Sequence, residues 1–516
     1  MLLAIFDKKE FQIIQFVVCN IFCIFPKNTA MLNKKDILFL NQYGIEQKTI
    51  QEQIELLNKN DSFIELSAPA IPENGIKKID NKDYYINIFE QQSSKHKLCK
   101  FVPASGAATR MFKRLISYQQ NPTDENYTEG NTFSVKSGFE NIENFAFYDK
   151  LISCKNNISN HKELSEMILF SCLSYAGIPK GLIEFHNYPD GSRTAFEEHL
   201  HEAIEIDKIG KIDIHLTVSP EFLSGFKTKL KKIQTKTGIN LKIDFSVQEK
   251  STDTIALYDD GNIARDNEDN ILLRPGGHGA LLQNLNKIDA DIVFVKNIDN
   301  LTHGDYLNET VAYKKLLGGV LIETVEELQK INSKLKNSPN ESAIESSIAD
   351  IKKEFNVDFY NSKDKVKDIL AFINRPIRVC GMVQNTGEPG GGPFWVKNSD
   401  GTISLQIVEK AQINLDLKDQ QKHFKAATHF NPVDLVCYLK NPEGEKFNLN
   451  NYVDKNACFV SEKTYQGKNI RVLEHPGLWN GAMADWLTIF VEVPLNTFNP
   501  VKELNDLLRQ MHQPKK

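Results

Sequence analysis

Several short stretches of this sequence combine residue types that could handle phosphate groups. In ASGAATR (104–110), tiny residues follow an apolar run and precede Arg110 at the expected start of a helix. Backbone N–H groups in such a loop can approach an anion closely, and the helix dipole adds to the attraction. We predict an anion site at Ser105, Gly106 and Ala107, with Arg110 as a fixed charge. A tight strand-to-helix turn packed with alanine is the alternative.

Two further charged residues follow along the chain. Lys180 lies in PKGLIEFH (179–186), where its ammonium group would suit a phosphate, although a loop lysine is more often only solvated. Asp299 follows the apolar run DIVFVKNI (291–298), so a carboxylate lies where a strand is expected to end. Such a carboxylate suits Mg²⁺ that bridges to phosphate oxygens. A capping role for Asp299 is the alternative.

The stretch RPGGHGALLQNLN (274–286) places His278 in a glycine turn directly before an apolar, helix-like run. The three glycines around this histidine are Gly276, Gly277 and Gly279. They would allow bare backbone to lie against a ligand, whereas a type II turn explains the same residues equally well. Gln248 follows another apolar run, and its amide could read the edge of a base. His199 and His201 lie two residues apart on an expected helix, and we interpret them as structural.

Short apolar runs rich in β-branched and aromatic residues must position these side chains. The runs cover residues 98–102, 212–218, 241–247, 291–298, 377–383 and 403–409. Continuous apolar runs that alternate with helical stretches are typical of a mostly parallel sheet covered on both faces, so we predict a Rossmann-like α/β fold. Ligands bind at the carboxyl ends of the strands in such sheets, which is where the residues above are expected.

Three regions are predicted around this sheet. A helical lead-in covers residues 31–95, the α/β domain covers residues 96–440, and a small C-terminal subdomain covers residues 441–516. Within the α/β domain, the polar stretch 323–355 predicts two helices broken at Asn337-Ser338-Pro339, which we interpret as a surface insertion.

The N-terminal residues form a separate case. The apolar run at 11–25 follows DKKE, has no clear cleavage site after it, and is too short to span a membrane. We interpret residues 1–30 as an upstream extension before Met31, with a membrane anchor as the alternative. No stable membrane association is expected.

Charge and cysteine content narrow the range of partners and compartments. The 516 residues include 62 basic and 67 acidic side chains, which give a net charge of −5, and no nucleic-acid partner is expected. The eight cysteines lie at positions 19, 23, 99, 154, 172, 380, 437 and 458 without a CxxC pair. This pattern predicts reduced thiols in a cytoplasmic protein, and no disulfide.

Taken in order, the motifs resemble those of nucleotidyltransferases of the nucleotide-diphospho-sugar superfamily, in particular the UDP-sugar pyrophosphorylase branch. The similar stretches are ASGAATRM (104–111), PKGLIEFH (179–186), PGGHGALL (275–282), FVKNIDNL (294–301) and FNPVKELNDLL (498–508). The nearest overall resemblance is to an uncharacterised bacterial family of a domain of unknown function, through GEPGGGPFW (387–395) and PGLWNGAMADW (476–486).

The resemblance implies a GT-A-like fold and a Mg²⁺-dependent reaction between a nucleoside triphosphate, with UTP favoured, and a sugar 1-phosphate. It places phosphate contacts at Arg110, Lys180 and Lys502, and metal ligands at Asp299 and Asp434. It places a sugar contact at Glu409. The nucleotide would contact Ser105, Gly106, Ala107, Gln248, Gly276, Gly277, His278 and Gly279. A GT-A-type glycosyltransferase and a non-catalytic nucleotide-sugar-binding protein are the alternatives.

This sequence also departs from the pattern of the branch. Ser105 and Ala108 lie where the branch favours glycine, and about seventy residues separate Arg110 from Lys180, far more than usual. Either departure could reshape the phosphate site. The glycines at 390–392 have no confident counterpart, so a sugar-facing loop and a simple flexible hairpin are equally compatible with them.

Overall fold

The computed structural model describes residues 32–59, 63–106, 108–155, 158–208, 211–357, 359, 362–387, 390–398 and 400–515. The chain forms two compact units. The smaller unit takes the chain up to Ser62 together with Lys250–His278 and Cys458–His475, and the larger unit takes the remainder. The limits of these two units differ from the predicted domain boundaries at residues 95 and 440. Those domain boundaries stay a prediction. Residues 1–30 and Ala107 lie outside the described residues.

The larger unit is built on a central mixed sheet. Along the sheet its strands are β2 (Ile76–Lys77), β18 (Leu487–Glu492), β11 (Ile377–Gln384), β15 (Asp434–Tyr438), β10 (Ile292–Lys296), β3 (Leu98–Pro103), β6 (Asp213–Thr217) and β7 (Ile243–Ser246). The short β14 (His429–Phe430) pairs with β11. Only β15 runs antiparallel to its neighbours along this path; the other pairs are parallel. The predicted mostly parallel α/β sheet is therefore confirmed.

The strand order reverses between β3 and β10. From β3 the chain adds β6 and β7 on one side, and β10 then pairs with β3 on the other side. In open α/β sheets, the crevice outside the carboxyl ends of the strands at such a switch point is the usual ligand site. The loops that follow β3 and β10 therefore lie where a ligand is expected.

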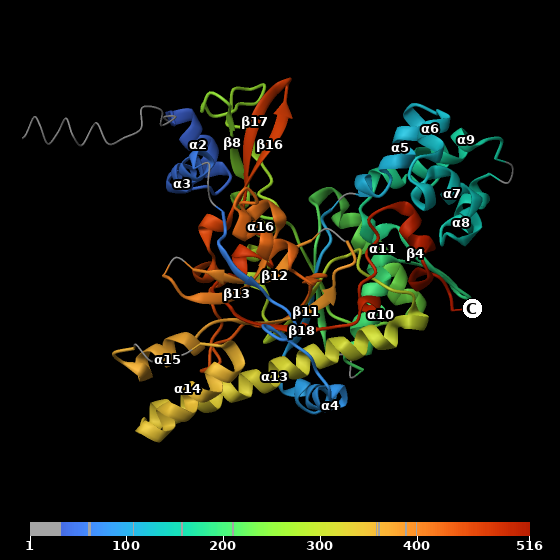
Figure 1. Cartoon of the computed structure of the whole chain (residues 1–516). Coiled ribbons are helices and arrows are strands. Elements are labelled where there is room, and N and C mark those ends of the chain that lie inside the picture. The colour runs from blue at the N-terminus through green and yellow to red at the C-terminus, as the bar shows by residue number, and fades with distance from the viewer. Residues whose placement is uncertain are drawn as a thin grey trace, which may run out of the picture. The chain divides into compact units, whose positions relative to one another are not determined.

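Both faces of the sheet are buried, which explains the continuous apolar runs. Successive residues of a strand alternate between two core clusters. On β10, Ile292 and Phe294 belong to one cluster, and Val293 and Val295 belong to the other. The first face is covered by α10 (Ala195–Ile206), α4 (Lys82–Gln92) and α13 (Leu307–Asn337), and the second by α12 (Leu282–Lys287), among other segments (Figure 1).

Two sequence predictions about this unit need correction. The helices broken at Ser338 are confirmed as α13 and α14 (Glu341–Phe355), but α13 begins at Leu307, and Val325, Leu328 and Ile331 within the predicted stretch are buried in the core. The stretch is thus part of the core and no mere surface insertion. The predicted strand at 403–409 exists as β13 (Ile403–Val408), but it pairs with β12 (Gly392–Lys397) in a separate sheet that also includes β1 (Leu66–Pro69).

A helical insertion accounts for the long distance between Arg110 and Lys180. It contains α5 (Lys113–Gln120), α6 (Asp124–Thr128), α7 (Val135–Glu140), α8 (Tyr148–Cys154) and α9 (His161–Glu166). The hairpin of β4 (Glu184–Tyr188) and β5 (Gly191–Thr194) follows it. Cys154 and Cys172 form a disulfide within the insertion, so the expectation that all thiols are reduced is wrong. The spacing of these two cysteines matches no common disulfide motif. They come together only because of the way α8, which ends at Cys154, packs in the fold. Cys99, Cys380, Cys437 and Cys458 are buried and lie outside this disulfide.

The smaller unit pairs two helices with an antiparallel sheet. The sheet contains β16 (Phe459–Tyr465), β17 (Lys468–Glu474), β8 (Thr254–Tyr258) and β9 (Leu273–Arg274). The helices α2 (Lys34–Gln42) and α3 (Gln47–Asn58) pack their apolar residues on this sheet. The predicted helices of the lead-in are thus present.

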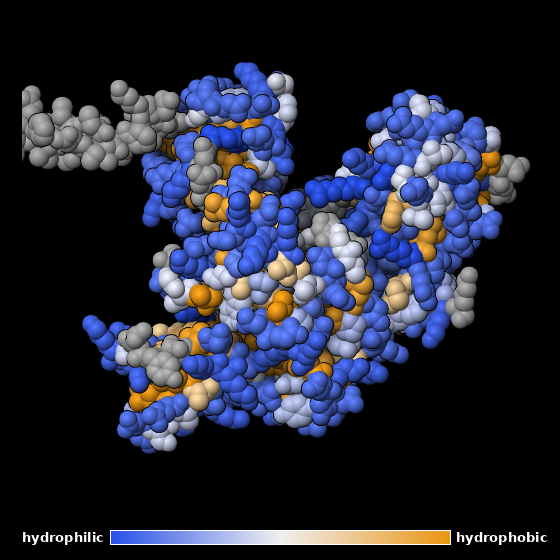
Figure 2. All heavy atoms as spheres, in the orientation of Figure 1, coloured by the Kyte–Doolittle hydropathy of each residue, from blue (hydrophilic) through white to orange (hydrophobic). Residues whose placement is uncertain are grey.

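The larger unit contains three further helices, α11 (Leu223–Thr237), α15 (Lys365–Ile373) and α16 (Lys418–Lys425). Most of the molecular face drawn in Figure 2 is hydrophilic. Within the described ranges, no helix combines the length and the apolar composition that crossing a membrane requires.

Candidate functional site

The loop after β10 carries Asp299 and is held from two sides. His199 of α10 lies with its Nε2 3.2 Å from the carbonyl oxygen of Ile298. On the other side, the C-terminal segment donates from the Val501 backbone N–H to the Asp299 carbonyl, at 3.0 Å. The Asn499 N–H donates to Asn300 Oδ1 at 2.9 Å. These bonds fix the backbone on both sides of the Asp299 carboxylate.

Three residues predicted separately from the sequence meet at this loop. Lys180 Nζ lies 2.7 Å from Asp299 Oδ2, and Lys502 Nζ lies 3.8 Å from the same oxygen. Lys180 also donates to the Val501 carbonyl at 2.7 Å. The Lys180 and Asp299 side chains are 11% and 12% exposed, whereas that of Lys502 is 53% exposed. The cluster therefore joins two cations and one anion at the switch point of the sheet.

Glycine at position 181 allows Lys180 to reach this place. A Cβ on Gly181 would lie 2.7 Å from the Phe226 ring and 3.5 Å from Ile298. Real Cβ atoms essentially never make contacts as short as the first, so a side chain here would push the segment away from α11. The Pro-Lys-Gly sequence thus brings the lysine close to the Asp299 loop.

The loop after β3 is the predicted anion site. Its backbone is tied to the end of β6, because the Ala104 N–H donates to the Thr217 carbonyl and Ser219 Oγ donates to the Ser105 carbonyl. Gly106 is exposed, and a Cβ added there would meet nothing within 4 Å. Arg110 is exposed, and within the described part of the chain it has no ion pair. The loop therefore presents open backbone and one unpaired guanidinium group.

A carboxylate that the sequence reasoning missed positions Lys502. Asp506 Oδ2 accepts from the backbone N–H groups of Lys502 and Glu503, each at 2.7 Å. Arg509 holds the other oxygen of Asp506 at 2.8 Å. Asp506 is buried, so it fixes the turn that carries Lys502. The only sequence signal for this role was that Asp506 follows Lys502 by four residues, close enough for its carboxylate to accept from the Lys502 backbone N–H.

A second group of charged side chains is buried between the central sheet and α10. Lys100 of β3 and Lys296 of β10 hold the two carboxylate oxygens of Glu202 at 3.0 and 2.6 Å. Lys100 also donates to the His199 carbonyl at 2.9 Å. Burial opposes ionisation of Glu202, yet the two lysines hold its pKa well below the ordinary value. Burial also lowers the pKa of Lys100 to about 7. This cluster links α10 to the two central strands.

Asp434, predicted as a second metal ligand, pairs with Lys314 of α13, and both side chains are buried. The described residues contain no group of three or more histidine, cysteine or carboxylate side chains that could hold a metal ion. Mg²⁺ is nevertheless commonly bound by one or two carboxylates together with phosphate and water oxygens. Asp299 alone fits that donor set, and a metal role for Asp434 stays a prediction.

Glu409 lies beside the glycine run. Asn480 Nδ2 donates to Glu409 Oε1 at 2.7 Å. A Cβ on Gly391 would lie 2.6 Å from Ile407 and 3.6 Å from both Asn480 and Glu409, so glycine is required for this packing. The two stretches GEPGGGPFW and PGLWNGAMADW thus meet at Glu409. A sugar contact at Glu409 remains a prediction.

The remaining predicted nucleotide contacts lie in both units. Gln248 follows β7 in the larger unit. In the smaller unit, Gly277 has a φ of +74°, and a Cβ on Gly276 would lie 2.5 Å from the Thr252 carbonyl, so the turn requires both glycines. Burial lowers the pKa of the His278 imidazole to about 4, although Glu474 opposes the shift. His278 is therefore neutral at pH 7. Gly279 is the first residue of the second segment of the larger unit.

The mostly parallel sheet and its strand order define a Rossmann-like α/β protein. The sequence profile of the family described as a domain of unknown function, DUF4301, matches residues 33–513. The chain therefore belongs to the DUF4301 family, which confirms the predicted resemblance to a family of a domain of unknown function. No match was found among curated proteins.

Solved structures to which this chain is similar include two pyrophosphorylases. A uridine diphosphate N-acetylglucosamine pyrophosphorylase from Trypanosoma brucei is 12% identical, with a TM-score of 0.49; the alignment covers 92% of this chain and 79% of that chain. A UDP-glucose pyrophosphorylase mutant from Leishmania major is 13% identical, with a TM-score of 0.43 and coverage of 93% and 79%. At these scores the likeness does not identify a function.

Proposed function

We propose that this protein is a nucleotidyltransferase that joins a nucleoside triphosphate, with UTP favoured, to a sugar 1-phosphate and releases pyrophosphate. The observation that carries the proposal is the cluster of Lys180, Lys502 and Asp299 at the switch point of the sheet. Arg110, on the neighbouring loop after β3, adds a further cation. Two flexible ammonium groups around one carboxylate suit phosphate chemistry, because the cations can leave the carboxylate for phosphate oxygens.

In the proposed reaction, a phosphate oxygen of the sugar 1-phosphate attacks the α-phosphorus of the triphosphate. The bond between the α-phosphorus and the oxygen that bridges to the β-phosphate breaks, and pyrophosphate leaves with that electron pair. Such transfers require positioning and charge neutralisation more than covalent help from the protein. Lys180, Lys502 and Arg110 would neutralise the phosphate oxygens, and no protein nucleophile is needed.

Asp299 would hold Mg²⁺ once the lysines have moved to phosphate oxygens. The metal, when bound, would supply further charge neutralisation across the phosphates. We also propose nucleotide contacts at the residues named from the resemblance, namely Ser105, Gly106, Ala107, Gln248, Gly276, Gly277, His278 and Gly279, and a sugar contact at Glu409. Asp434 would serve as a second metal ligand only if it left Lys314.

Pyrophosphate release tests this proposal. The full chain is incubated with Mg²⁺, each of the four ribonucleoside triphosphates and a panel of sugar 1-phosphates. We expect release with one pair, lost in Asp299→Asn and retained in Asp416→Asn, which changes an exposed aspartate before α16. Equal release by the Asp299 variant would contradict the proposed site.

Silence of the wild type across the panel would overturn the proposed reaction for these substrates. Calorimetric binding of a UDP-sugar without pyrophosphate release would then favour a glycosyltransferase or a binding protein.

A further inference from the structure

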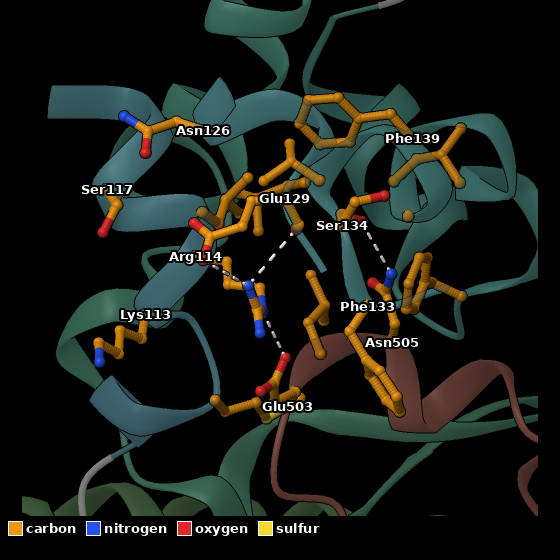
Figure 3. A pocket seen from close by; sticks show the side chains of 18 of the residues that line it. Lys113, Arg114, Ser117, Asn126, Glu129, Phe133, Ser134, Phe139, Glu503 and Asn505 are labelled. Carbon is orange, nitrogen blue, oxygen red and sulfur yellow. Dashed lines mark hydrogen bonds and ion pairs between the residues drawn. The ribbon is translucent and has the colours of Figure 1, made fainter. Parts of the chain in front are cut away.

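The helical insertion encloses a cavity of about 250 Å³. Its walls come from α5, α6 and α7, from the residues before α5, and from the C-terminal segment directly after Lys502. Figure 3 shows Arg114 at its centre, with Glu503 and Glu129 on two sides. The cavity is built mainly by residues inserted between Arg110 and Lys180, although Arg110, Met111 and residues 503–505 of two motifs named above also line it.

The charges that line the cavity favour an anion. Arg114 is held by Glu503 at 2.8 Å and lies 4.0 Å from a carboxylate oxygen of Glu129. Both acidic groups of the cavity are therefore engaged with one arginine. Arg110 and Lys113 also line the cavity, and among the described residues neither takes part in an ion pair. The lining thus has three cations for two carboxylates, and the unpaired groups are both positive.

The sequence of α5 strengthens this imbalance. Lys113 and Arg114 occupy the first turn of the helix, which contains no acidic residue and no side-chain cap. Acidic side chains usually complement the positive end of a helix dipole, so two cations here repel that end. An anion in the cavity would relieve this repulsion.

The rest of the lining combines apolar and uncharged polar side chains. The apolar ones include Met111, Leu115, Phe133, Phe139, Phe145 and Ile168, and the polar ones are Ser117, Asn126, Ser134 and Asn505. In Figure 3, Phe133 and Phe139 lie on the side of the cavity opposite Lys113. Small-molecule sites commonly combine apolar side chains with a few polar and charged groups, and this volume suits a compact ligand.

We propose that the cavity is a separate binding site for a compact anion, a phosphate monoester or a carboxylate carried on an aromatic or aliphatic body. The anionic head contacts Arg114, with Lys113 nearby, and the apolar body packs on Phe133 and Phe139. Arg114 suits this role because its guanidinium group can bind either head through two hydrogen bonds.

The position of Glu503 gives the ligand a route to the Asp299 cluster. A ligand on Arg114 competes with the Glu503 side chain. The backbone N–H groups of Glu503 and of the neighbouring Lys502 both donate to the Asp506 carboxylate. Occupancy of the cavity therefore shifts the turn that carries Lys502. This consequence rests on the proposed function, whereas binding itself does not.

Titration calorimetry on the full chain tests the binding, with phenyl phosphate as the probe. We expect phenyl phosphate to bind at least about tenfold more tightly than inorganic phosphate or phenol, because the cavity contacts both parts. Arg114→Met should weaken binding at least about tenfold. The matched control Lys136→Met removes one positive charge from an exposed site of α7 outside the cavity and should leave binding unchanged.

Two further variants keep the result decisive. Ser117→Phe fills the cavity from α5 without changing its charge and should also abolish binding. This variant tests the site independently, in case Arg114→Met does not fold. Lys180→Met should leave binding unchanged. Loss of phenyl phosphate binding in Lys180→Met, but not in Arg114→Met and Ser117→Phe, would overturn the proposal by placing the anion at the Asp299 cluster. Equal affinity for phenyl phosphate and inorganic phosphate would overturn it as well. Neither result depends on whether the chain transfers nucleotides.

Discussion

Two groups of lysines and carboxylates in the larger unit have similar contacts but different surroundings. Lys180 lies 2.7 Å from Asp299, and Lys296 lies 2.6 Å from Glu202. The first pair is 11% and 12% exposed and continues to the exposed Lys502, whereas the second pair is 1% and 0% exposed. Judged only by the distance between the ammonium nitrogen and the carboxylate oxygen, the two ion pairs would be expected to have the same role.

Burial separates these roles. At the Asp299 cluster, a ligand can replace either Lys180 or Asp299 in their ion pair. The charge that is left then contacts either solvent or the ligand. Around Glu202, no solvent replaces a lost partner, and removing one leaves an isolated charge at high cost. The partly exposed Asp299 cluster is therefore suited to exchange of partners, and the buried Glu202 cluster to holding α10 on β3 and β10.

The largest expected effect is on the buried cluster. Glu202→Gln should lower the free energy of unfolding by about 3–5 kcal/mol, because Lys100 and Lys296 lose their common anion. Urea unfolding followed by circular dichroism measures the change. The matched control is Glu205→Gln on the same helix, whose side chain is 39% exposed. Equal losses in both variants would show that burial does not distinguish the clusters.

The exposed cluster should respond in activity instead. Lys180→Met should lower kcat/KM for pyrophosphate release about 10²- to 10³-fold, if the loss resembles removal of one electrostatic contact in other enzymes. Unfolding should change by only about 1 kcal/mol. Lys227→Met, at an exposed position of α11, serves as the control. A loss of stability as large as that of Glu202→Gln would place Lys180 in the structural class.

Asp434 sharpens the comparison, because its metal role is open. Its pairing with Lys314 in the core predicts that Asp434→Asn lowers the free energy of unfolding by about 3 kcal/mol. The Mg²⁺ concentration that gives half-maximal pyrophosphate release should stay within about twofold, whereas Asp299→Asn should raise it strongly. A large increase for Asp434→Asn would establish Asp434 as a metal ligand.

The smallest effect concerns pH. Burial lowers the pKa of Lys100 from 10.5 to about 7 in the folded chain. Between pH 7 and 10.5 the unfolded chain therefore binds more protons at this group, so stability due to Lys100 rises with pH across that window. The slope is at most about 1.4 kcal/mol per pH unit. Urea unfolding at pH 7, 8 and 9 should show a shallower slope for Lys100→Met, and identical slopes would contradict the shift.

Much of the fold and part of the site could be predicted from the sequence. Five apolar runs became strands of the central sheet, and Lys180, Asp299 and Lys502 were each identified before the structure joined them. Local residue patterns sufficed for Asp299, because it directly follows an apolar run and strand ends in α/β sheets meet at one edge. Lys502 was indicated only by the family resemblance.

Long-range pairing was not predictable in the same way. Lys100 and Lys296 lie inside runs that read as apolar strands, and nothing near them in the sequence indicates Glu202 as their partner. The disulfide of Cys154 and Cys172 likewise depends on how α8 packs. The strand β18 escaped prediction, because it lies in a region assigned to a separate subdomain.

The C-terminal segment determines when this site can form during synthesis. Val501 and Asn499 hold the Asp299 loop, and Lys502 itself completes the cluster. Domains fold from the N-terminus as the ribosome elongates at about 5–20 residues per second, so the central strands β3 and β10 emerge many seconds before Lys502. A nascent chain can pair these strands long before it has the cluster. A message that is cut short upstream of this segment would therefore yield a folded sheet with no complete site.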